Sequence, residues 1–229
     1  MVTGATIALR TDASRDIGTG HVMRCLTLAR ALRGAGAACH FITRAHSGHL
    51  GARIAAEGFE VTVLPAPEGP APEGPPVHAR WAGVAWAQDG AETRAALEAR
   101  PDWLVVDHYA LDARWQDAAC PAGTRCMVID DLADRRHACD LLLDQNLGHA
   151  AEGYDGLVPE HCTRLTGPRH ALLRPEFADA RAGALAGRAG RGLKHLMISM
   201  GGTDAVDATS AVLVALREAP LPPDLRISV

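Results

Sequence analysis

The sequence predicts an α/β protein with a Rossmann-type parallel-sheet domain, followed by the start of a second, truncated α/β domain. Short apolar runs alternate with helical patterns along the first two thirds of the chain, which is the order of a parallel sheet with crossover helices. Residues 183–192 hold four glycines and two arginines, a composition typical of a linker. We therefore expect domains over residues 1–182 and 193–229, joined by a linker over 183–192.

The expected elements of the first domain follow one another with short connections. Helical patterns cover residues 20–32, 50–57, 84–99 and 112–119. The segment 65–76 is rich in Pro, Gly and Glu, so we expect an exposed loop without a catalytic role. Strands are predicted over residues 6–11, 39–43, 60–64, 103–107, 126–129, 140–143 and 164–166.

After the predicted linker, a new strand, glycine turn and helix begin at Leu193. The helix is expected over residues 206–217, and residues 225–229 resemble the next strand. An independent α/β domain needs at least about 50 residues and usually about 100 or more. The sequence therefore predicts that this polypeptide is truncated relative to a working two-domain protein.

Composition restricts the possible partners and the cellular compartment. The 229 residues carry 23 Lys and Arg against 27 Asp and Glu, so the basic surplus of a nucleic-acid binder is missing. No apolar run approaches the roughly 18 residues of a membrane span, and the first apolar stretch is too short for a signal peptide. The six cysteines form no CxxC pair, which indicates reduced thiols. We expect a cytoplasmic protein with neither nucleic-acid nor membrane partners.

A glycine loop after the first strand is the first candidate site. Gly18 and Gly20 allow the backbone to approach a ligand, and the helix that follows offers free N–H groups. Met23 stands where a dinucleotide fingerprint would have its third glycine, which argues against NAD. We expect Gly18 and Gly20 to contact the substrate.

His21 and Arg24 lie on one face of this helix, three residues apart. The helix dipole disfavours the imidazolium, so a neutral ring at His21 could accept a proton. Arg24 would favour that neutral form further and could contact an anionic or polar ligand. The pattern equally allows His21 as a capping residue and Arg24 as a solvated surface arginine.

Two further candidate sites follow predicted strands. Asp107 and Tyr109 flank His108 at a strand end, where such groups suit sugar hydroxyl recognition or acid–base chemistry; an ordinary polar strand end is the alternative. The turn over residues 201–204 leads into a helix, ready for a phosphate. The same pattern equally allows a plain turn in which Asp204 or Thr203 caps the helix.

Metal binding is not expected. His137 with Cys139, and His161 with Cys162, lack the usual spacing of zinc ligands. Asp130 and Asp131 follow a strand and could hold magnesium or a sugar, but a solvated turn is the simpler interpretation.

Taken together, these segments resemble the hydrolases of the pseudaminic-acid pathway and related spore-coat polysaccharide proteins. The loop over residues 17–24 is the first segment that matches these proteins. Those hydrolases cleave UDP-2,4-diacetamido-2,4,6-trideoxy-β-L-altropyranose to UDP and the free sugar. Matching segments follow in the same order along nearly the whole chain, at residues 106–109, 130–131, 139–146, 154–159, 171–177 and 200–204.

The resemblance implies a two-domain architecture like that of GT-B glycosyltransferases. Its first domain holds the sugar and its second holds most of the UDP, without metal or cofactor. It implies an inverting UDP-sugar hydrolase for pseudaminic acid, and so for cell-surface polysaccharide or flagellin glycosylation. His21 matches the family's general base and Tyr109 a tyrosine near the reacting centre. The residues expected to bind substrate are Gly18, Gly20, Arg24, Asp107, Tyr109, Arg174, Gly201, Gly202, Thr203 and Asp204.

The chemistry of the reaction is consistent with the hypothesis of an inverting UDP-sugar hydrolase. A base deprotonates water on the face opposite UDP, and the leaving anion needs charge stabilisation more than a strong acid. The family's second domain extends past residue 229, so we expect this polypeptide alone to bind UDP poorly and to turn over slowly or not at all. Two alternatives remain: a glycosyltransferase that uses a UDP-amino sugar, and a non-catalytic module that binds a nucleotide sugar. The sequence pattern defines neither the stereochemistry of the sugar nor the oligomeric state.

Overall fold

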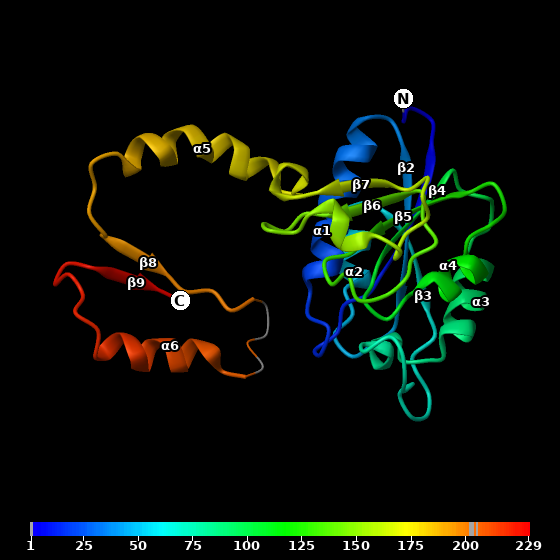
Figure 1. Cartoon of the computed structure of the whole chain (residues 1–229), viewed down its shortest axis with the longest axis horizontal. Coiled ribbons are helices and arrows are strands. Elements are labelled where there is room, and N and C mark those ends of the chain that lie inside the picture. Colours follow the sequence, from blue (N-terminus) through cyan, green and yellow to red (C-terminus); the bar gives the residue numbers. More distant parts are fainter. Residues whose placement is uncertain (1, 202–203, 205) are drawn as a thin grey trace. The chain divides into compact units, whose positions relative to one another are not determined.

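The computed structural model describes residues 2–201, 204 and 206–229. It divides into two compact units, Met1–Leu172 and Leu173–Val229 (Figure 1). The predicted linker, residues 183–192, lies within the second unit.

Seven strands of the described residues form one parallel sheet in the first unit (Figure 1). The spatial order is β3-β2-β1-β4-β5-β6-β7, which confirms the predicted α/β class. The strands are β1 (Thr6–Thr11), β2 (Ala38–Arg44), β3 (Glu60–Leu64), β4 (Trp103–Asp107), β5 (Arg125–Ile129), β6 (Leu141–Asp144) and β7 (Thr163–Thr166).

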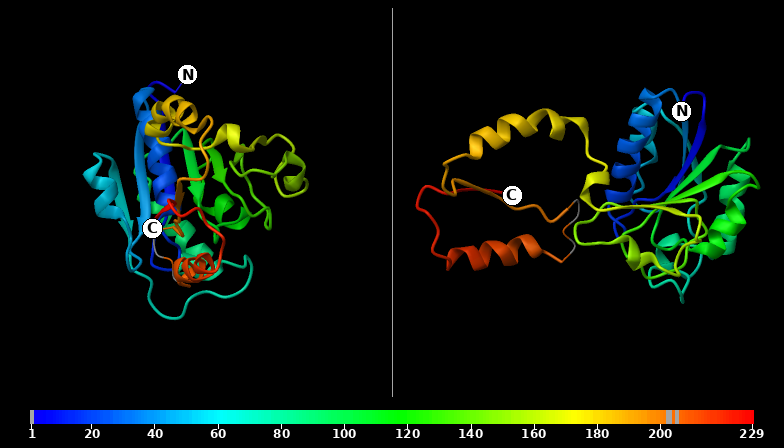
Figure 2. Two further views of the ribbon diagram at one scale, coloured as in Figure 1. Left: turned by 90° about the vertical axis from the view of Figure 1, so that its left-hand side faces the viewer. Right: turned by 45° about the horizontal axis from the view of Figure 1, so that its top comes forward.

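Helices cover both faces of this sheet (Figure 2). They are α1 (Gly20–Gly34), α2 (Gly51–Ala56), α3 (Trp86–Ala96) and α4 (Ala113–Ala119). Because strand side chains alternate between faces, Leu9 of β1 packs in the core with α1 and α2, whereas its neighbour Ala8 packs with Trp115 of α4. The helix α3 lies beside α4 on that second face.

The strand order reverses between β1 and β4. From β1 the chain proceeds outward through β2 to β3, then returns to β4 and continues outward to β7. At such a switch point the connections leave the carboxyl ends of two adjacent strands in opposite directions, which opens a crevice where ligands bind. Thr11 of β1 and Asp107 of β4 are register partners at this edge.

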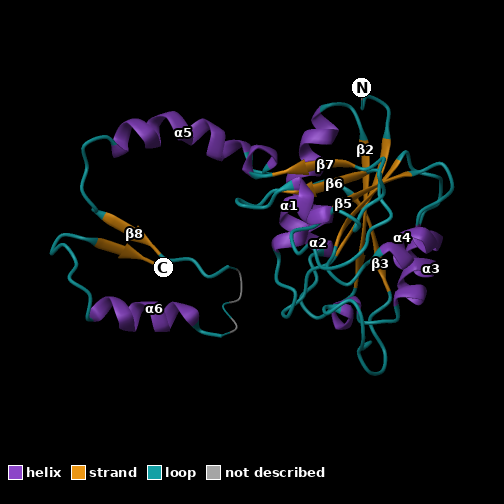
Figure 3. Cartoon of the chain, in the orientation of Figure 1, coloured by secondary structure: helices purple, strands orange, loops and turns teal. Residues whose placement is uncertain are grey.

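The long connection between β3 and α3 has two parts. Residues 65–76 form neither helix nor strand, as predicted (Figure 3). The short 3-10 helix η1 (Ala79–Ala82) then precedes α3. Further 3-10 turns are η2 (Ala151–Tyr154) and η3 (Pro168–His170).

The second unit contains α5 (Pro175–Arg188), β8 (His195–Met197), α6 (Ala208–Arg217) and β9 (Arg226–Ser228), with β8 and β9 paired in parallel. The predicted strand, helix and strand after residue 193 are confirmed. The structure differs at the predicted linker, where residues 183–188 belong to α5. This helix is favoured by Pro175 at its start, by Glu176 in its first turn and by several alanines. Together they outweigh the cost in helix stability of the internal glycines, which is about 1 kcal/mol each.

Among the described residues, no helix is long and apolar enough to cross a membrane.

Candidate functional site

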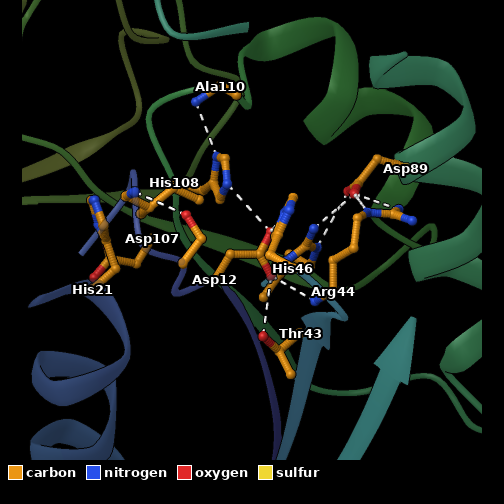
Figure 4. Close-up of polar contacts among 12 residues, drawn as sticks. Asp12, His21, Thr43, Arg44, His46, Asp89, Asp107, His108 and Ala110 are labelled. Carbon is orange, nitrogen blue, oxygen red and sulfur yellow. Dashed lines mark hydrogen bonds and ion pairs between the residues drawn. The ribbon is translucent and has the colours of Figure 1, made fainter. Parts of the chain in front are cut away.

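His21 and Asp107 meet at the switch point between β1 and β4 (Figure 4). His21 lies in the first turn of α1 and is 6% exposed, while Asp107 ends β4 and is fully buried. Nδ1 of the imidazole is 2.6 Å from Oδ1 of the carboxylate. The two side chains therefore form a buried His–Asp pair.

The protonation of this pair follows from the carboxylate. Burial raises the pKa of Asp107, but the charge of His21 when protonated and the hydrogen bond and charge of Arg24 outweigh burial, and the pKa falls to about 2. An ionised carboxylate only accepts hydrogen bonds. Nδ1 of His21 must then carry the proton, and Nε2 is the nitrogen that can act as a base.

Arg24 holds the same carboxylate from the other side. Its Nε lies 2.5 Å from Oδ2 of Asp107 and its Nη2 lies 2.6 Å from Oδ1. Its Nη1 lies 3.3 Å from Oδ2 of Asp131. The side chain is 13% exposed, so Arg24 is not a solvated surface arginine. Nor is His21 a cap, because its side chain is committed to Asp107.

Both oxygens of Asp107 are thus occupied by His21 and Arg24. The carboxylate has no exposed surface on which a sugar hydroxyl could be received. The geometry therefore fits a residue that fixes the imidazole, and it does not fit the predicted contact between Asp107 and substrate.

Tyr109 packs against the imidazole of His21. The ring centroids are 4.6 Å apart at an interplanar angle of 85°. The phenol donates a hydrogen bond to Asp131, and burial together with that bond and the charge of Asp131 raises the pKa of Tyr109. Tyr109 and Arg24 thereby share Asp131 as an acceptor.

The prediction of a solvated turn at Asp130 and Asp131 is wrong. Asp130 is fully buried and its Oδ1 lies 2.6 Å from Nη2 of Arg135. Tyr154 also donates to its carboxylate. The two carboxylates lie at the end of β5 and are held by separate cations, which the sequence pattern did not reveal.

The glycine loop is closed by its own hydrogen bonds. Gly18 has a φ of +79°, which favours glycine, and its N–H donates to the carbonyl of Ser14 at 2.9 Å. The hydroxyl of Ser14 accepts from the N–H groups of Asp16 and Ile17. At the end of the loop, the side chain of Thr19 makes no capping hydrogen bond to α1.

Gly20 begins α1 and differs from Gly18 in its surroundings. A Cβ there would meet no atom within 4 Å, and the backbone does not require positive φ. Neither packing nor conformation demands glycine at this position. The open space in front of the first turn of α1 leaves its N–H groups accessible to an anion.

A second buried network, which sequence reasoning missed, adjoins this pair (Figure 4). Oδ1 of Asp12 accepts from Arg10 at 2.6 Å and from the N–H of Arg44 at 2.7 Å. Oδ2 faces Nε2 of His108 at 3.3 Å and Nε2 of His46 at 3.4 Å. These are ion-pair distances without good hydrogen-bond direction. Ala110 donates its N–H to Nδ1 of His108, so Nε2 carries the proton of that neutral ring.

His108 connects the two networks. Its ring stacks near His21, with centroids 6.5 Å apart and planes 22° apart. Burial lowers the pKa of His108, and Asp12 offsets this only in part. Beyond Asp12, the buried carboxylate of Asp89 accepts from Arg10 and Arg44. Charged residues inside apolar strand patterns were the signal that could have revealed this network.

The predicted residues of the second unit have other local partners. The guanidinium of Arg174 lies 5.3 Å from the ring centre of Phe177. Gly201 has a φ of +82°. The carboxylate of Asp204 accepts from the N–H groups of Ala208 and Thr209 at 2.8 and 3.0 Å. The carboxylate of Asp204 therefore accepts from the first turn of α6, whose N-cap residue is Asp207, while Gly202 and Thr203 lie outside the described residues.

No group of three or more His, Cys, Asp or Glu side chains is placed to hold a metal ion within the part of the chain that the structure describes.

The chain is similar in sequence to a known protein. It is the UDP-2,4-diacetamido-2,4,6-trideoxy-beta-L-altropyranose hydrolase of Campylobacter jejuni subsp. jejuni serotype O:2, which is 26% identical over 200 residues. The match covers 86% of this chain and 61% of the hydrolase. No family model matches the chain.

Solved structures that share the fold include two of a plant protein. Arabidopsis thaliana UGT89C1 complexed with quercetin matches 98% of this chain and 69% of its own, with a TM-score of 0.59. The same protein complexed with UDP matches 99% and 66%, with a TM-score of 0.60. Sequence identity is 13% in both cases, so these matches concern the fold.

The comparisons confirm the GT-B-like fold class and the resemblance seen in the sequence. The chain spans 61% of the length of the hydrolase. In sequence it is similar to a UDP-sugar hydrolase, and in fold it is similar to a protein whose structure was solved with UDP.

Proposed function

We propose that this chain provides the sugar-side half of an enzyme that hydrolyses UDP-2,4-diacetamido-2,4,6-trideoxy-β-L-altropyranose. Water attacks the anomeric carbon, the bond from that carbon to the β-phosphate oxygen breaks, and its electron pair leaves with UDP. The products are UDP and the free sugar of inverted configuration. The observation that carries this proposal is the His21–Asp107 pair at the switch point.

His21 acts as the general base. Its Nδ1–H is held by Asp107, so Nε2 presents a lone pair to the attacking water and takes its proton. Asp107 and Arg24 are positioning residues, because they fix the imidazole while both carboxylate oxygens stay buried. Tyr109 restricts the imidazole from its edge.

The leaving diphosphate needs positive potential more than a proton. The first turn of α1 supplies N–H groups and a dipole end beside the base, and Gly20 leaves the approach open. Gly18 shapes this loop. We propose that Arg174 and residues 201–204 contact the nucleotide, with the carboxylate of Asp204 also accepting from the N–H of Ala208.

The sequence similarity to the Campylobacter hydrolase supports this substrate, and UGT89C1, which shares the fold, was solved in complex with UDP. We propose a metal-independent reaction in the cytoplasm, where it would supply the sugar for pseudaminic acid. The same fold would also suit a glycosyltransferase, in which an acceptor hydroxyl replaces water.

The test uses the complete enzyme, of which this chain is the sugar-side half, and this UDP-sugar in the absence of any acceptor. We expect release of UDP and incorporation of one solvent oxygen at the anomeric carbon, detected by mass spectrometry in H₂¹⁸O. His21→Ala should lower kcat by about 10²–10⁴-fold while the substrate Kd changes little. UDP release that requires an added acceptor would favour the glycosyltransferase, and unchanged turnover in His21→Ala would remove His21 as the base.

A further inference from the structure

Three rings form a cluster beside the proposed base. Trp81 and Tyr109 lie 5.7 Å apart with planes 25° apart, and His78 lies 4.5 Å from Trp81 and 5.6 Å from Tyr109. The centroid of Trp81 is 6.4 Å from that of His21, edge to face. We call Trp81, His78 and Tyr109 the ring cluster.

The backbone after the proline-rich loop fixes the position of Trp81. Trp81 lies in η1, and its N–H donates to the carbonyl of His78 at 2.9 Å. Gly83 ends η1 with a φ of +74°, and a Cβ there would lie 2.5 Å from Pro67 and 2.8 Å from His46. The turn at Gly83 is therefore tightly packed, and it holds the indole near His21.

The indole N–H of Trp81 lacks a partner. Nε1 is buried and makes no hydrogen bond to any described residue. An indole nitrogen can only donate, and a buried donor without an acceptor destabilises the state that contains it. By contrast, Nε1 of Trp115 donates to Asp89 at 2.8 Å. A bound molecule with an acceptor oxygen would satisfy Trp81.

The residues that precede the cluster in the chain border a cavity, although no ring of the cluster lines it. A cavity of about 600 Å³ is lined by Val77, the chain neighbour of His78, and by Arg135. The guanidinium of Arg135 lies 5.7 Å from the ring centre of Tyr109. All three rings of the cluster remain partly exposed.

We propose that the ring cluster binds the sugar of the nucleotide sugar, with Trp81 packing on a C–H face of the pyranose and its Nε1–H donating to a carbonyl or hydroxyl oxygen. This inference rests on the proposed function. The sugar, and not the uracil, is the occupant because the cluster borders the base that must reach the anomeric carbon. In the substrate, a diphosphate and a ribose separate the uracil from that carbon.

The expected change in KM follows from the loss of the aromatic contact and of the hydrogen bond that Trp81 would donate. Trp81→Ala should raise KM for the UDP-sugar about tenfold or more, with a smaller change in kcat and an unchanged Kd for UDP alone. Trp81→Phe keeps a ring but loses the donor, and it should raise KM about threefold. Trp103→Phe is the matched control, because Trp103 lies at the opposite end of β4 from Asp107.

The measurements are steady-state UDP release and calorimetric titration with the UDP-sugar and with UDP. Substrate Kd and KM within twofold of wild type in Trp81→Ala would overturn the inference. If that variant does not fold by circular dichroism, Trp81→Phe decides, and an unchanged KM there would overturn it. A wild-type protein that binds the UDP-sugar through Trp81 without hydrolysing it would contradict the proposed function and leave this inference standing.

Discussion

Nδ1 of His21 lies 2.6 Å from Oδ1 of Asp107, although 86 positions separate the two residues in the chain. The pair exists because β1 and β4 are neighbours in the sheet and α1 starts at their shared carboxyl edge. A carboxylate that accepts from Nδ1 fixes the tautomer of the ring. The same arrangement serves many hydrolases in which a histidine must accept a proton through Nε2.

Asp107→Asn should lower kcat by about 10²–10⁴-fold, because an amide can donate to Nδ1 and favour the wrong tautomer. The substrate Kd should change much less, since Asp107 is buried away from the ligand. Steady-state kinetics and calorimetry measure the two effects. Asp117→Asn, on the exposed side of α4, is the control, and equal activity of the two variants would contradict the assignment.

Arg24→Lys should lower kcat about tenfold and the free energy of unfolding by about 2 kcal/mol. Lysine cannot make the two parallel bonds of Arg24 to Asp107 or reach Asp131 at the same time. Arg30→Lys on the same helix provides the comparison, because Arg30 pairs with Glu57 near the surface. That change should stay within about 0.5 kcal/mol in denaturant unfolding and leave kcat unaltered.

Gly20→Ala separates binding from stability. The new methyl meets no protein atom and the backbone allows it, so stability should be unchanged or rise by up to about 1 kcal/mol. KM for the UDP-sugar should increase, because the methyl enters the space in front of α1. Gly34→Ala, at the other end of α1 and equally open, should leave KM unchanged. Equal KM values for both variants would show that substrate does not use this space.

The sequence predicted the sheet well because its strands are short apolar runs with polar ends. The predicted bounds of β1, β3 and β4 agree with the structure. The helix α5 escaped prediction because its glycines resemble a linker, although alanines and Pro175 stabilise it. Local pattern was sufficient wherever one element could be judged from its own residues.

Only part of the candidate site could be predicted, because several of its contacts join residues that are far apart in the sequence. His21 and Arg24 share a helix face, which spacing reveals, but their common partner Asp107 depends on which strand lies beside β1. Trp81 follows an irregular loop with no periodic signal, so nothing in the pattern brings it near His21. Such contacts depend on strand order and loop path, which residue spacing does not encode.

The stability of the protein should respond to acid through Asp107. Its pKa is about 2 in the folded state and about 3.9 in an unfolded chain. This carboxylate therefore adds about 2 kcal/mol of stability above pH 4, which is lost as the pH falls toward 2. Urea unfolding of wild type and Asp107→Asn across this range should show a shallower pH dependence in the variant. Parallel curves would contradict the assignment.

Asp89→Asn should destabilise the fold without involving the proposed base. The carboxylate of Asp89 is fully buried and accepts from Arg10, Arg44 and Trp115. Its removal leaves two buried guanidinium groups short of a counter-charge, which costs about 3–5 kcal/mol. Trp115→Phe removes one neutral donor from the same carboxylate and should cost only about 1–2 kcal/mol. Thermal unfolding measures both changes, and the exposed Glu98→Gln is the control. Similar losses of unfolding free energy in Asp89→Asn and Glu98→Gln would show that the buried ion network does not stabilise the fold.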